Sequence, residues 1–308
     1  MDDHNQLSPK IIEWLKKKIG GAFEIQQISA LKGSTSSHLS EITAKRGEQL
    51  RHFVLRLFTW EEWLAMEPDL AKHEAASLLE AGRTGLKVPE MIAFDETGEQ
   101  CGLPAVLMTK IEGAVVLQPA DENAWFTGMA QTLARIHEHG AEDFQWEYFS
   151  YNDALKMEKP VWSNHADDWM RAFYIAAGVR PPTEFCFIHR DFHPANVLWE
   201  DGRISGVVDW VNACRGPAGV DLGHCRVNLA MLYGVSAADR FLEAYQKAAA
   251  GKFIYHPHWD LLSLVDVVEG PPAVYPGWAV FGMTGLTDEL MRHRLDEYLL
   301  SLLNRFDE

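Results

Sequence analysis

The amino-acid sequence predicts an α+β protein in which a small, sheet-rich N-terminal part precedes a larger, mainly helical C-terminal part. Three observations lead to this prediction. Strand-like runs separated by turn residues fill residues 23–58 and return at residues 91–111. From Trp125 onward, apolar residues recur at helical spacing instead. The 308 residues are enough for two domains, and no internal repeat or low-complexity linker divides them.

The first elements have clear boundaries. Ser8 and Pro9 are typical of a helix N-cap and first helical position, and Gly20-Gly21 ends the helix after a run of lysines. Three strands are then expected at residues 23–33, 38–46 and 50–58. The sequence RGEQ lies between the second and third strands as a turn, so the sheet should be antiparallel.

A helical region follows the third strand. Residues 59–82 contain two negatively charged helical segments, and Thr59 with Glu62 three residues later resembles a capping box. Gly82 is the expected end of the second helix. Two further strands are predicted around residues 91–95 and 104–111.

The C-terminal part is predicted to be mainly helical. Phe126, Met129, Leu133 and Ile136 are spaced by three or four residues, which is typical of the buried side of a helix. Similar patterns predict further helices at residues 222–234, 238–251, 258–268 and 287–306.

Composition excludes several classes of protein. A formal net charge of -16 argues against nucleic acid as a partner, and it suits either a cationic small substrate or simple solubility. No run of about 18 apolar residues occurs, so no transmembrane helix and no membrane partner are expected. The N-terminus begins acidic and polar, unlike a secretory signal, so we expect a cytoplasmic protein. The four cysteines show no metal-ligand spacing and are expected to be reduced thiols.

The segment FIHRDFHPANVLW, Phe187–Trp199, contains the densest group of polar residues. His189, Asp191 and His193 alternate, as they would on one face of a strand that begins a two-histidine, one-carboxylate iron site. Pro194 argues against a regular strand continuing through them. A set of polar residues satisfied within a turn is the plain structural alternative.

The downstream sequence favours another pattern. The runs VLWE and RISGVVDW flank Asp201-Gly202, which is a strong hairpin signal. Pairing across that turn brings Asn196 and Asp209 to the same end of the hairpin, where Asp191 also arrives. An amide oxygen and two carboxylates are hard oxygen donors that suit Mg²⁺.

The spacing of these residues matches the catalytic loop of kinases. His189-Arg190-Asp191 followed by Asn196 fits the pattern H-R-D-x-x-x-x-N, in which the aspartate takes the hydroxyl proton and the asparagine holds a metal ion. A later aspartate of that pattern also holds metal, and Asp209 is its counterpart. The iron-site hypothesis is therefore much weaker.

The motifs HRDFHPANVLW, GVVDW and GPAGVDLGH together resemble the aminoglycoside phosphotransferase family, which includes choline kinase-like enzymes. The resemblance implies the two-lobed, protein-kinase-like fold. Residues 1–108 would form a nucleotide-binding lobe with an antiparallel sheet, residues 109–113 a hinge, and residues 114–308 a mainly helical catalytic and substrate-binding lobe. It implies an enzyme that uses ATP or GTP, with Mg²⁺, to phosphorylate a hydroxyl group of a small molecule.

The resemblance assigns roles to the residues of these motifs. Asp191 would orient or deprotonate the acceptor hydroxyl, while Asn196 and Asp209 would hold Mg²⁺ on the nucleotide phosphates. Three residues would form the scaffold of the catalytic loop: His189, His193 and Asp221.

Nucleotide-binding residues are expected in the N-terminal part. Arg56 occupies the place of the usual third-strand lysine, with Glu74 as its helix partner, although a surface arginine and a solvated glutamate are an open alternative. The segment LKGSTSSHLS would cover the phosphates with Gly33 and Ser34. Met108 begins the connecting segment, where the backbones of Thr109 and Ile111 would meet the adenine edge.

The sequence departs from the family pattern H-G-D-x-H-x-x-N at one position, because Arg190 replaces the glycine. Arginine at that position is typical of protein kinases. However, only eleven residues lie between Asp209 and Asp221, which leaves no room for an activation loop. Regulation by loop phosphorylation is therefore not expected.

Several classes of acceptor are compatible with the sequence. An aminoglycoside is the first candidate, with acidic residues of the C-terminal helices for its amines: Asp266, Glu269 and Asp288. Aromatic residues of the same region would instead line a pocket for a macrolide, choline or another amine: Trp259, Tyr275 and Trp278. A metabolic kinase acting on choline, homoserine or a thio-sugar, and a nucleotide-binding protein without transfer activity, are the alternatives.

Overall fold

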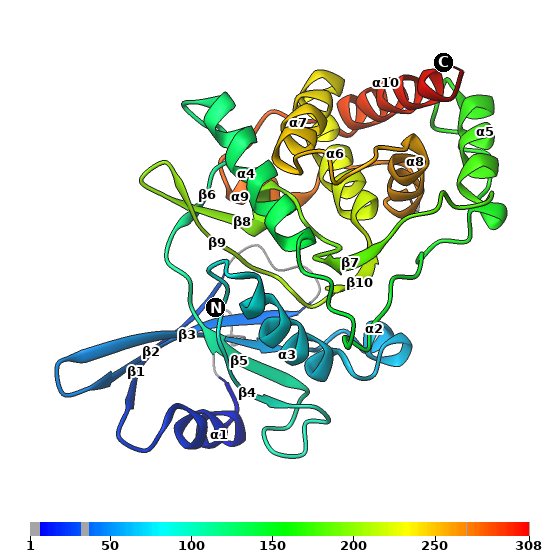
Figure 1. Ribbon diagram of the computed structural model, residues 1–308. Helices are drawn as coiled ribbons and strands as arrows, with labels where there is room; N and C mark the ends of the chain where they lie inside the picture. The colour runs from blue at the N-terminus through cyan, green and yellow to red at the C-terminus, as the bar shows by residue number, and fades with distance from the viewer. Residues whose placement is uncertain (1–6, 32–36, 269, 308) are drawn as a thin grey trace. The chain divides into compact units, whose positions relative to one another are not determined.

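The computed structural model describes residues 7–31, 37–268 and 270–307 (Figure 1). The described chain divides into two compact units. The first unit contains the residues up to Glu112 together with Gly206–Asn212, and the second contains Gly113–Ser205 and the residues from Ala213 onward. An antiparallel sheet dominates the first unit and helices dominate the second, so the predicted α+β class is confirmed.

The first unit is built around a five-stranded antiparallel sheet with the strand order β1-β2-β3-β5-β4. All five predicted strands are present, although the first and the fifth along the chain are shorter than predicted. Its elements are α1 (Pro9–Ile19), β1 (Glu24–Ala30), β2 (His38–Arg46), β3 (Gln49–Leu57), α2 (Glu61–Met66), α3 (Leu70–Ala81), a 3-10 turn (Gly82–Thr84), β4 (Met91–Asp95) and β5 (Ala105–Thr109).

Local signals in the sequence determine several of these boundaries. The Ser8 hydroxyl accepts a hydrogen bond from the Ile11 N–H at 3.3 Å, and Pro9 opens α1. Helix α1 ends at Gly20, whose φ of 100° lies in the range that favours glycine. The predicted helix limits are therefore confirmed.

The predicted capping box is wrong. Helix α2 begins at Glu61, so its N-cap is Trp60, and no side chain caps it. Thr59 lies one residue too early to reach the free N–H groups of the first turn. The predicted end of α3 is confirmed, because Gly82 is its C-cap and the chain continues as the 3-10 turn.

The two faces of the sheet carry different kinds of residue. Leu55 and Leu57 of β3 belong to a hydrophobic cluster that includes Trp14 and Leu15 of α1. Because side chains alternate along a strand, Arg56 points to the opposite face. That face is covered by α3, and Figure 1 shows α1 and α3 on opposite sides of the sheet.

The second unit is mainly helical, and its helices include all those that the sequence predicts. Its elements are β6 (Ala114–Val115), α4 (Glu122–His137), a 3-10 turn (Ala154–Lys156), α5 (Ala166–Ala176), β7 (Phe185–Ile188), a 3-10 turn (Pro194–Asn196), β8 (Val197–Glu200), β9 (Arg203–Val207, which ends in the first unit), β10 (Cys214–Pro217), α6 (Ala218–Tyr233), α7 (Val235–Ala248), α8 (Pro257–Asp266), α9 (Pro276–Val280) and α10 (Asp288–Asp307).

The stripe of apolar residues on α4 is buried, as predicted. Strands β8 and β9 form the expected hairpin. Asp201 and Gly202 have φ values of 49° and 73°, as a type I′ turn requires. None of the helices in the described residues is both long and apolar enough to cross a membrane.

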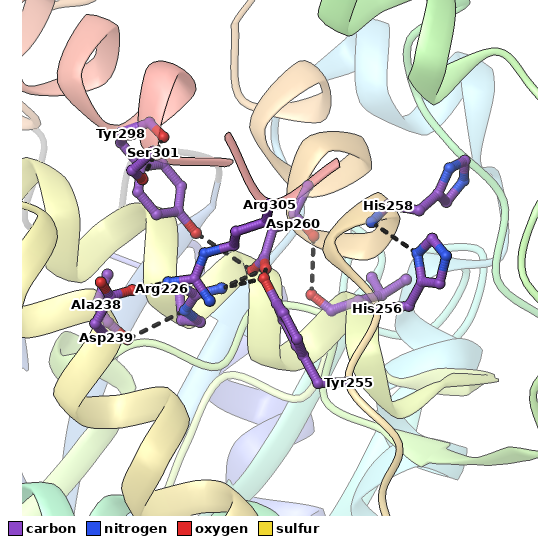
Figure 2. A network of polar contacts seen from close by, with 12 residues as sticks. Arg226, Ala238, Asp239, Tyr255, His256, His258, Asp260, Tyr298, Ser301 and Arg305 are labelled. Carbon is purple, nitrogen blue, oxygen red and sulfur yellow. Dashed lines mark hydrogen bonds and ion pairs between the residues drawn. The ribbon is translucent and has the colours of Figure 1, made fainter. Parts of the chain in front are cut away.

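A buried ion-pair network fixes the helices that surround α6 (Figure 2). Arg226 of α6 is completely buried and pairs with Asp260 of α8 and with Asp239 of α7, the latter at 2.8 Å. The hydroxyl groups of Tyr255 and Tyr298 donate to the same Asp260 carboxylate. Because removing one partner would leave buried charge uncompensated, this network should hold α6 rigidly.

Candidate active site

The loop that follows β7 carries the predicted catalytic residues, and Asp221 holds its backbone. Asp221 lies in the first turn of α6 and is completely buried. Its Oδ2 accepts a hydrogen bond from the His189 N–H at 2.6 Å, and its Oδ1 accepts one from the Arg190 N–H at 2.5 Å. The two residues before Asp191 are thus fixed to α6.

A histidine from α4 completes the environment of Asp221. His137 Nε2 lies 3.2 Å from Asp221 Oδ2, and His137 Nδ1 lies 2.6 Å from the Tyr245 hydroxyl of α7. His137 belongs to none of the motifs that predict the site. Its partner is 84 residues away in the chain, so no local pattern indicates the contact.

Both carboxylate oxygens of Asp191 have partners within the second unit. His224 Nε2 lies 3.0 Å from Oδ1, and Asn196 Nδ2 donates to Oδ2 at 3.0 Å and to the Asp191 carbonyl at 2.9 Å. Burial acts to raise the pKa of Asp191, but the charge of His193 and the hydrogen bond from His224 outweigh it. The pKa therefore lies well below its ordinary value, and the carboxylate is ionised at neutral pH.

His224 is a further residue of the site to which no sequence motif gave a role. It follows Asp221 by three residues on α6, so both side chains lie on the same side of the helix. Burial lowers the pKa of His224, whereas the hydrogen bond and charge of Asp191 raise it above its ordinary value. A usable signal was present, because His224 ends the motif GPAGVDLGH at helical spacing from Asp221.

His189 and His193 hold the loop through their Nδ1 atoms. His189 is completely buried, and its Nδ1 accepts a hydrogen bond from the Asp191 N–H at 3.3 Å. His193 Nδ1 accepts one from the Ala195 N–H at 3.2 Å and so caps the 3-10 turn that contains Asn196. Across the described parts of the chain, no three His, Cys, Asp or Glu side chains form a group that could hold a metal ion.

A second polar cluster lies in the first unit. Arg56 Nη1 is 3.2 Å from Glu74 Oε1, and Arg56 Nη2 donates to Asp209 Oδ1 at 2.8 Å. The alternative of a surface arginine on an edge strand is wrong, because Arg56 is buried on the central strand β3. Asp209 has a φ of 68°, a left-handed conformation that aspartate tolerates better than most residues.

Glu74 has an unusual environment for a carboxyl group. It is fully buried, and burial raises its pKa. The positive charge of Arg56 lowers this pKa, and the negative charge of Asp209 raises it. Together with burial, these effects give Glu74 a pKa of about 7. Glu74 therefore changes its protonation state near neutral pH.

The connecting segment of residues 109–113 contains a backbone N–H without an acceptor among the described residues. Met108 is buried in β5, and the Thr109 N–H donates to the Glu90 carbonyl at 2.9 Å. Within the part of the chain that the structure describes, the Ile111 N–H has no hydrogen-bond acceptor. Of the two predicted adenine-contacting backbones, only that of Ile111 has a free N–H.

The predicted metal ligands have the donor chemistry that Mg²⁺ prefers. The Nδ2 atom of Asn196 makes all the hydrogen bonds of its amide, so Oδ1 is open among the described residues. In the first unit, Asp209 Oδ2 is likewise open, and its side chain is 36% exposed. Both are hard oxygen donors. Gly33 and Ser34 lie outside the described residues.

The acidic residues proposed for an acceptor already have partners. Asp266 Oδ2 accepts a hydrogen bond from the Tyr148 hydroxyl at 3.0 Å, and burial raises the pKa of Asp266. Asp288 Oδ1 accepts one from the Val274 N–H at 2.8 Å at the start of α10. Glu269 lies outside the described residues.

The aromatic alternative is wrong for both tryptophans. Trp259 and Trp278 are 4% and 1% exposed, and they belong to two different hydrophobic clusters. Tyr275 packs against the cluster of Trp278. Helical spacing could not distinguish these core side chains from pocket-lining ones.

Comparison with known proteins places these sites in a family context. A sequence model described as the phosphotransferase enzyme family matches residues 34–265. Homoserine kinase from Bradyrhizobium diazoefficiens is 28% identical over 206 residues, which cover 59% of this chain and 58% of that enzyme. The chain therefore spans little more than half the length of this curated relative.

Solved structures share the fold across nearly the whole chain. Choline kinase LicA from Streptococcus pneumoniae has a TM-score of 0.60 at 17% identity, covering 95% of this chain and 99% of that chain. A thermostable mutant of aminoglycoside phosphotransferase APH(4)-Ia, in ternary complex with ADP and hygromycin B, has a TM-score of 0.60 at 16% identity, covering 94% and 97%. These likenesses confirm the two-lobed, protein-kinase-like fold.

Proposed function

The chain belongs to the phosphotransferase enzyme family, and on that basis we propose that it transfers the terminal phosphoryl group of ATP or GTP to a hydroxyl group of a small molecule. One observation carries the proposal. Asp191 is an ionised carboxylate held on both oxygens, by His224 and Asn196, in a loop that Asp221 anchors. This is the arrangement that orients a hydroxyl for attack on a phosphoryl group.

Asp191 accepts the proton of the acceptor hydroxyl or orients that hydroxyl. Its depressed pKa makes it a weak base, which suits phosphoryl transfer, where little proton transfer is needed before the phosphoryl group leaves the nucleotide. Positioning and charge neutralisation then supply most of the rate.

The nucleotide binds, in this proposal, through the first unit. Arg56 contacts the phosphates and Glu74 orients its guanidinium, which the buried contact between them supports. The Ile111 N–H meets the adenine or guanine edge, beside Met108 and the Thr109 backbone. Gly33 and Ser34 would cover the phosphates.

Mg²⁺ would be held by Asn196 Oδ1 and Asp209 Oδ2, whose open oxygens support the assignment. When bound, the ion would neutralise negative charge on the phosphate oxygens. The contact between Arg56 and Asp209 gives the arginine a carboxylate partner in the absence of phosphate.

Two acceptor classes follow from different observations. An aminoglycoside remains the first candidate from the motifs, but Asp266 and Asp288, which would bind its amines, are engaged by neighbouring groups. The sequence similarity to homoserine kinases favours a second candidate, a small hydroxy amino acid.

A product screen tests the proposal. The protein is incubated with Mg²⁺, ATP or GTP and a panel of aminoglycosides, macrolides, homoserine, choline and thio-sugars, and products are identified by mass. At least one acceptor should gain a phosphoryl group. Saturable nucleotide binding without any phosphorylated product would favour a nucleotide-binding protein lacking transfer activity.

The metal assignment predicts the behaviour of Asp209→Ala. Nucleotide affinity in the presence of Mg²⁺ should fall by about tenfold or more, because a carboxylate ligand is lost. Without Mg²⁺ the affinity should not fall, since the change also releases Arg56. Calorimetric titration measures both, with exposed Asp143→Ala as the control. Unchanged affinity in Mg²⁺ would remove Asp209 from the metal site.

A further inference from the structure

Three aromatic rings surround the guanidinium group of Arg190. Its carbon lies 4.1 Å from the ring centre of Tyr151, 4.3 Å from that of Phe149 and 5.4 Å from that of Tyr148. All three distances are within the range of a cation–π interaction. We call Tyr148, Phe149 and Tyr151 the aromatic cage.

The guanidinium is held firmly inside the aromatic cage. Arg190 is only 7% exposed, whereas Phe149 and Tyr151 are 46% and 47% exposed. Arg190 Nη2 also donates a hydrogen bond to the Phe149 carbonyl at 2.6 Å. The exposed rings therefore shield a cation and are not part of a hydrophobic core.

A carboxylate adds negative charge to the aromatic cage. The Tyr148 hydroxyl donates to Asp266 Oδ2 at 3.0 Å. Burial raises the pKa of Asp266, while the Tyr148 hydrogen bond and the positive charge of Arg190 lower it. Aromatic faces next to a carboxylate are the chemical features that bind organic cations.

The backbone at this position is strained. Arg190 has a φ of 67°, a left-handed conformation that is unfavourable for a long side chain. Asp221 holds its N–H, and the aromatic cage holds its side chain. Glycine would adopt the same conformation without strain, so the side chain at this position has a role that outweighs its conformational penalty.

We propose that the aromatic cage is an organic-cation site, suited to guanidinium or alkylammonium groups, which the chain fills with its own Arg190. Because Arg190 occupies the aromatic cage, the segment that carries the three rings is tied to the loop that contains Asp191. It also closes the cage to any cationic group of an acceptor.

The consequence for acceptor choice rests on the proposed function. Asp191 follows Arg190 directly, and His224, which contacts Asp191, lies within the electrostatic influence of Asp266. An acceptor that is oriented by Asp191 and carries a cationic group long enough to reach the aromatic cage would find it occupied by Arg190. Arg190 is a specificity-determining residue that disfavours quaternary ammonium alcohols such as choline.

Binding of small cations to Arg190→Gly tests the proposal without any need for turnover. The probes are N-ethylguanidinium and tetramethylammonium, titrated at non-denaturing concentrations and followed by calorimetry and ligand-detected NMR. Arg190→Gly should bind both probes saturably, and wild type should not. Tyr151→Ala added to Arg190→Gly should weaken binding by about fivefold or more.

Arg180→Gly is the matched control. Arg180 is exposed, and its guanidinium carbon lies over one ring of the aromatic cage, 5.6 Å from the Tyr148 ring centre. Its removal should create no binding. Folded Arg190→Gly that binds neither probe, or whose binding is unchanged by Tyr151→Ala, overturns the proposal.

Wild-type protein gives a second measurement that does not depend on the glycine variant. The Arg190 side-chain protons should show upfield ring-current shifts by NMR, and Tyr151→Ala should reduce them. Shifts typical of a solvated arginine overturn the proposal.

Turnover separates this inference from the proposed function. Arg190→Gly should raise kcat/KM for choline relative to a neutral alcohol by about tenfold compared with wild type. Absence of turnover by either protein contradicts the proposed function, while the binding results still decide the cage. Turnover with an unchanged preference overturns the specificity role.

Discussion

At the scale of single residues, the carboxylate of Asp191 is oriented by its neighbours within the second unit. His224 and Asn196 engage its two oxygens, and Asp221 holds the backbone just before it. A group whose orientation is already fixed loses little entropy when the acceptor binds. Under the proposed function, His224 would therefore be a positioning residue for Asp191, although no motif assigned it that role.

Replacement of His224 should reduce turnover without affecting nucleotide binding. His224→Ala removes one of the two contacts that orient Asp191, so kcat should fall by about 10- to 100-fold. His224→Gln keeps a hydrogen-bond donor and should recover part of that loss. Steady-state kinetics and nucleotide titration measure both effects, with exposed His293→Gln as the control. An unchanged kcat in His224→Ala would contradict the positioning role.

Replacement of Asp221 should destabilise the fold. In Asp221→Asn, an amide NH₂ group replaces a carboxylate oxygen that accepts a backbone hydrogen bond, so a buried donor is left without an acceptor. A loss of about 3 kcal/mol in the free energy of unfolding is expected. Urea unfolding measures it against Asp167→Asn, whose carboxylate is 93% exposed. Equal stability of the two variants would rule out the anchoring role.

At the scale of elements, strand β3 and helix α3 bury an arginine and a glutamate against each other. The Arg56–Glu74 pair lies on the face of the sheet opposite α1. Burial raises the pKa of Glu74 to about 7, above its value in the unfolded chain. A raised pKa stabilises the fold at pH values below the unfolded pKa, and this stabilisation is lost as pH rises through the folded pKa.

This pair predicts a pH dependence of stability in the absence of nucleotide. Between about pH 4.5 and 7, the contribution of Glu74 should decline by on the order of 3 kcal/mol. Glu74→Gln should remove the decline and be more stable than wild type at pH 8. Urea unfolding at pH 5 and pH 8 tests this, with exposed Glu61→Gln as the control. A stability difference between Glu74→Gln and wild type that is equal at both pH values would contradict it.

Elements with local signals were predictable, and those without were not. Helix α1 and the β8–β9 hairpin follow from Ser8, Pro9 and the Asp201-Gly202 turn. Strand β10 was missed because its short CRGP sequence has little strand propensity and forms only by pairing with β7. Propensity also misplaced the N-cap of α2.

At the scale of the whole molecule, the chain passes between the two units more than once. After β9 it returns to the first unit as Gly206–Asn212. Gly206 permits a close approach, since a Cβ there would meet Ile111 and the Lys87 carbonyl. This short return places Asp209 beside Arg56. The spacing from Asp191 to Asn196 was readable in the sequence, whereas this tertiary contact between Arg56 and Asp209 was not.

In the candidate site, too, local motifs could be recognised in the sequence and tertiary contacts could not. Asp191, Asn196 and Asp221 belong to recognisable motifs, so the sequence could nominate them for the candidate site. The contacts of His137 and the enclosure of Arg190 depend on the packing of segments that are distant in the chain, so no local sequence pattern predicts them. The burial of Trp259 and Trp278 shows that they are core residues and do not line an open pocket, and sequence periodicity alone could not show this.

The most direct test of the central claim compares wild type with Asp191→Asn. Each protein is given nucleotide carrying an isotopic label in its terminal phosphoryl group, together with an acceptor identified by the product screen. Wild type should transfer the labelled group to the acceptor, and Asp191→Asn should lose about 10³-fold or more in kcat while still binding nucleotide. Retention of transfer by Asp191→Asn, at a rate near that of wild type, would contradict the account.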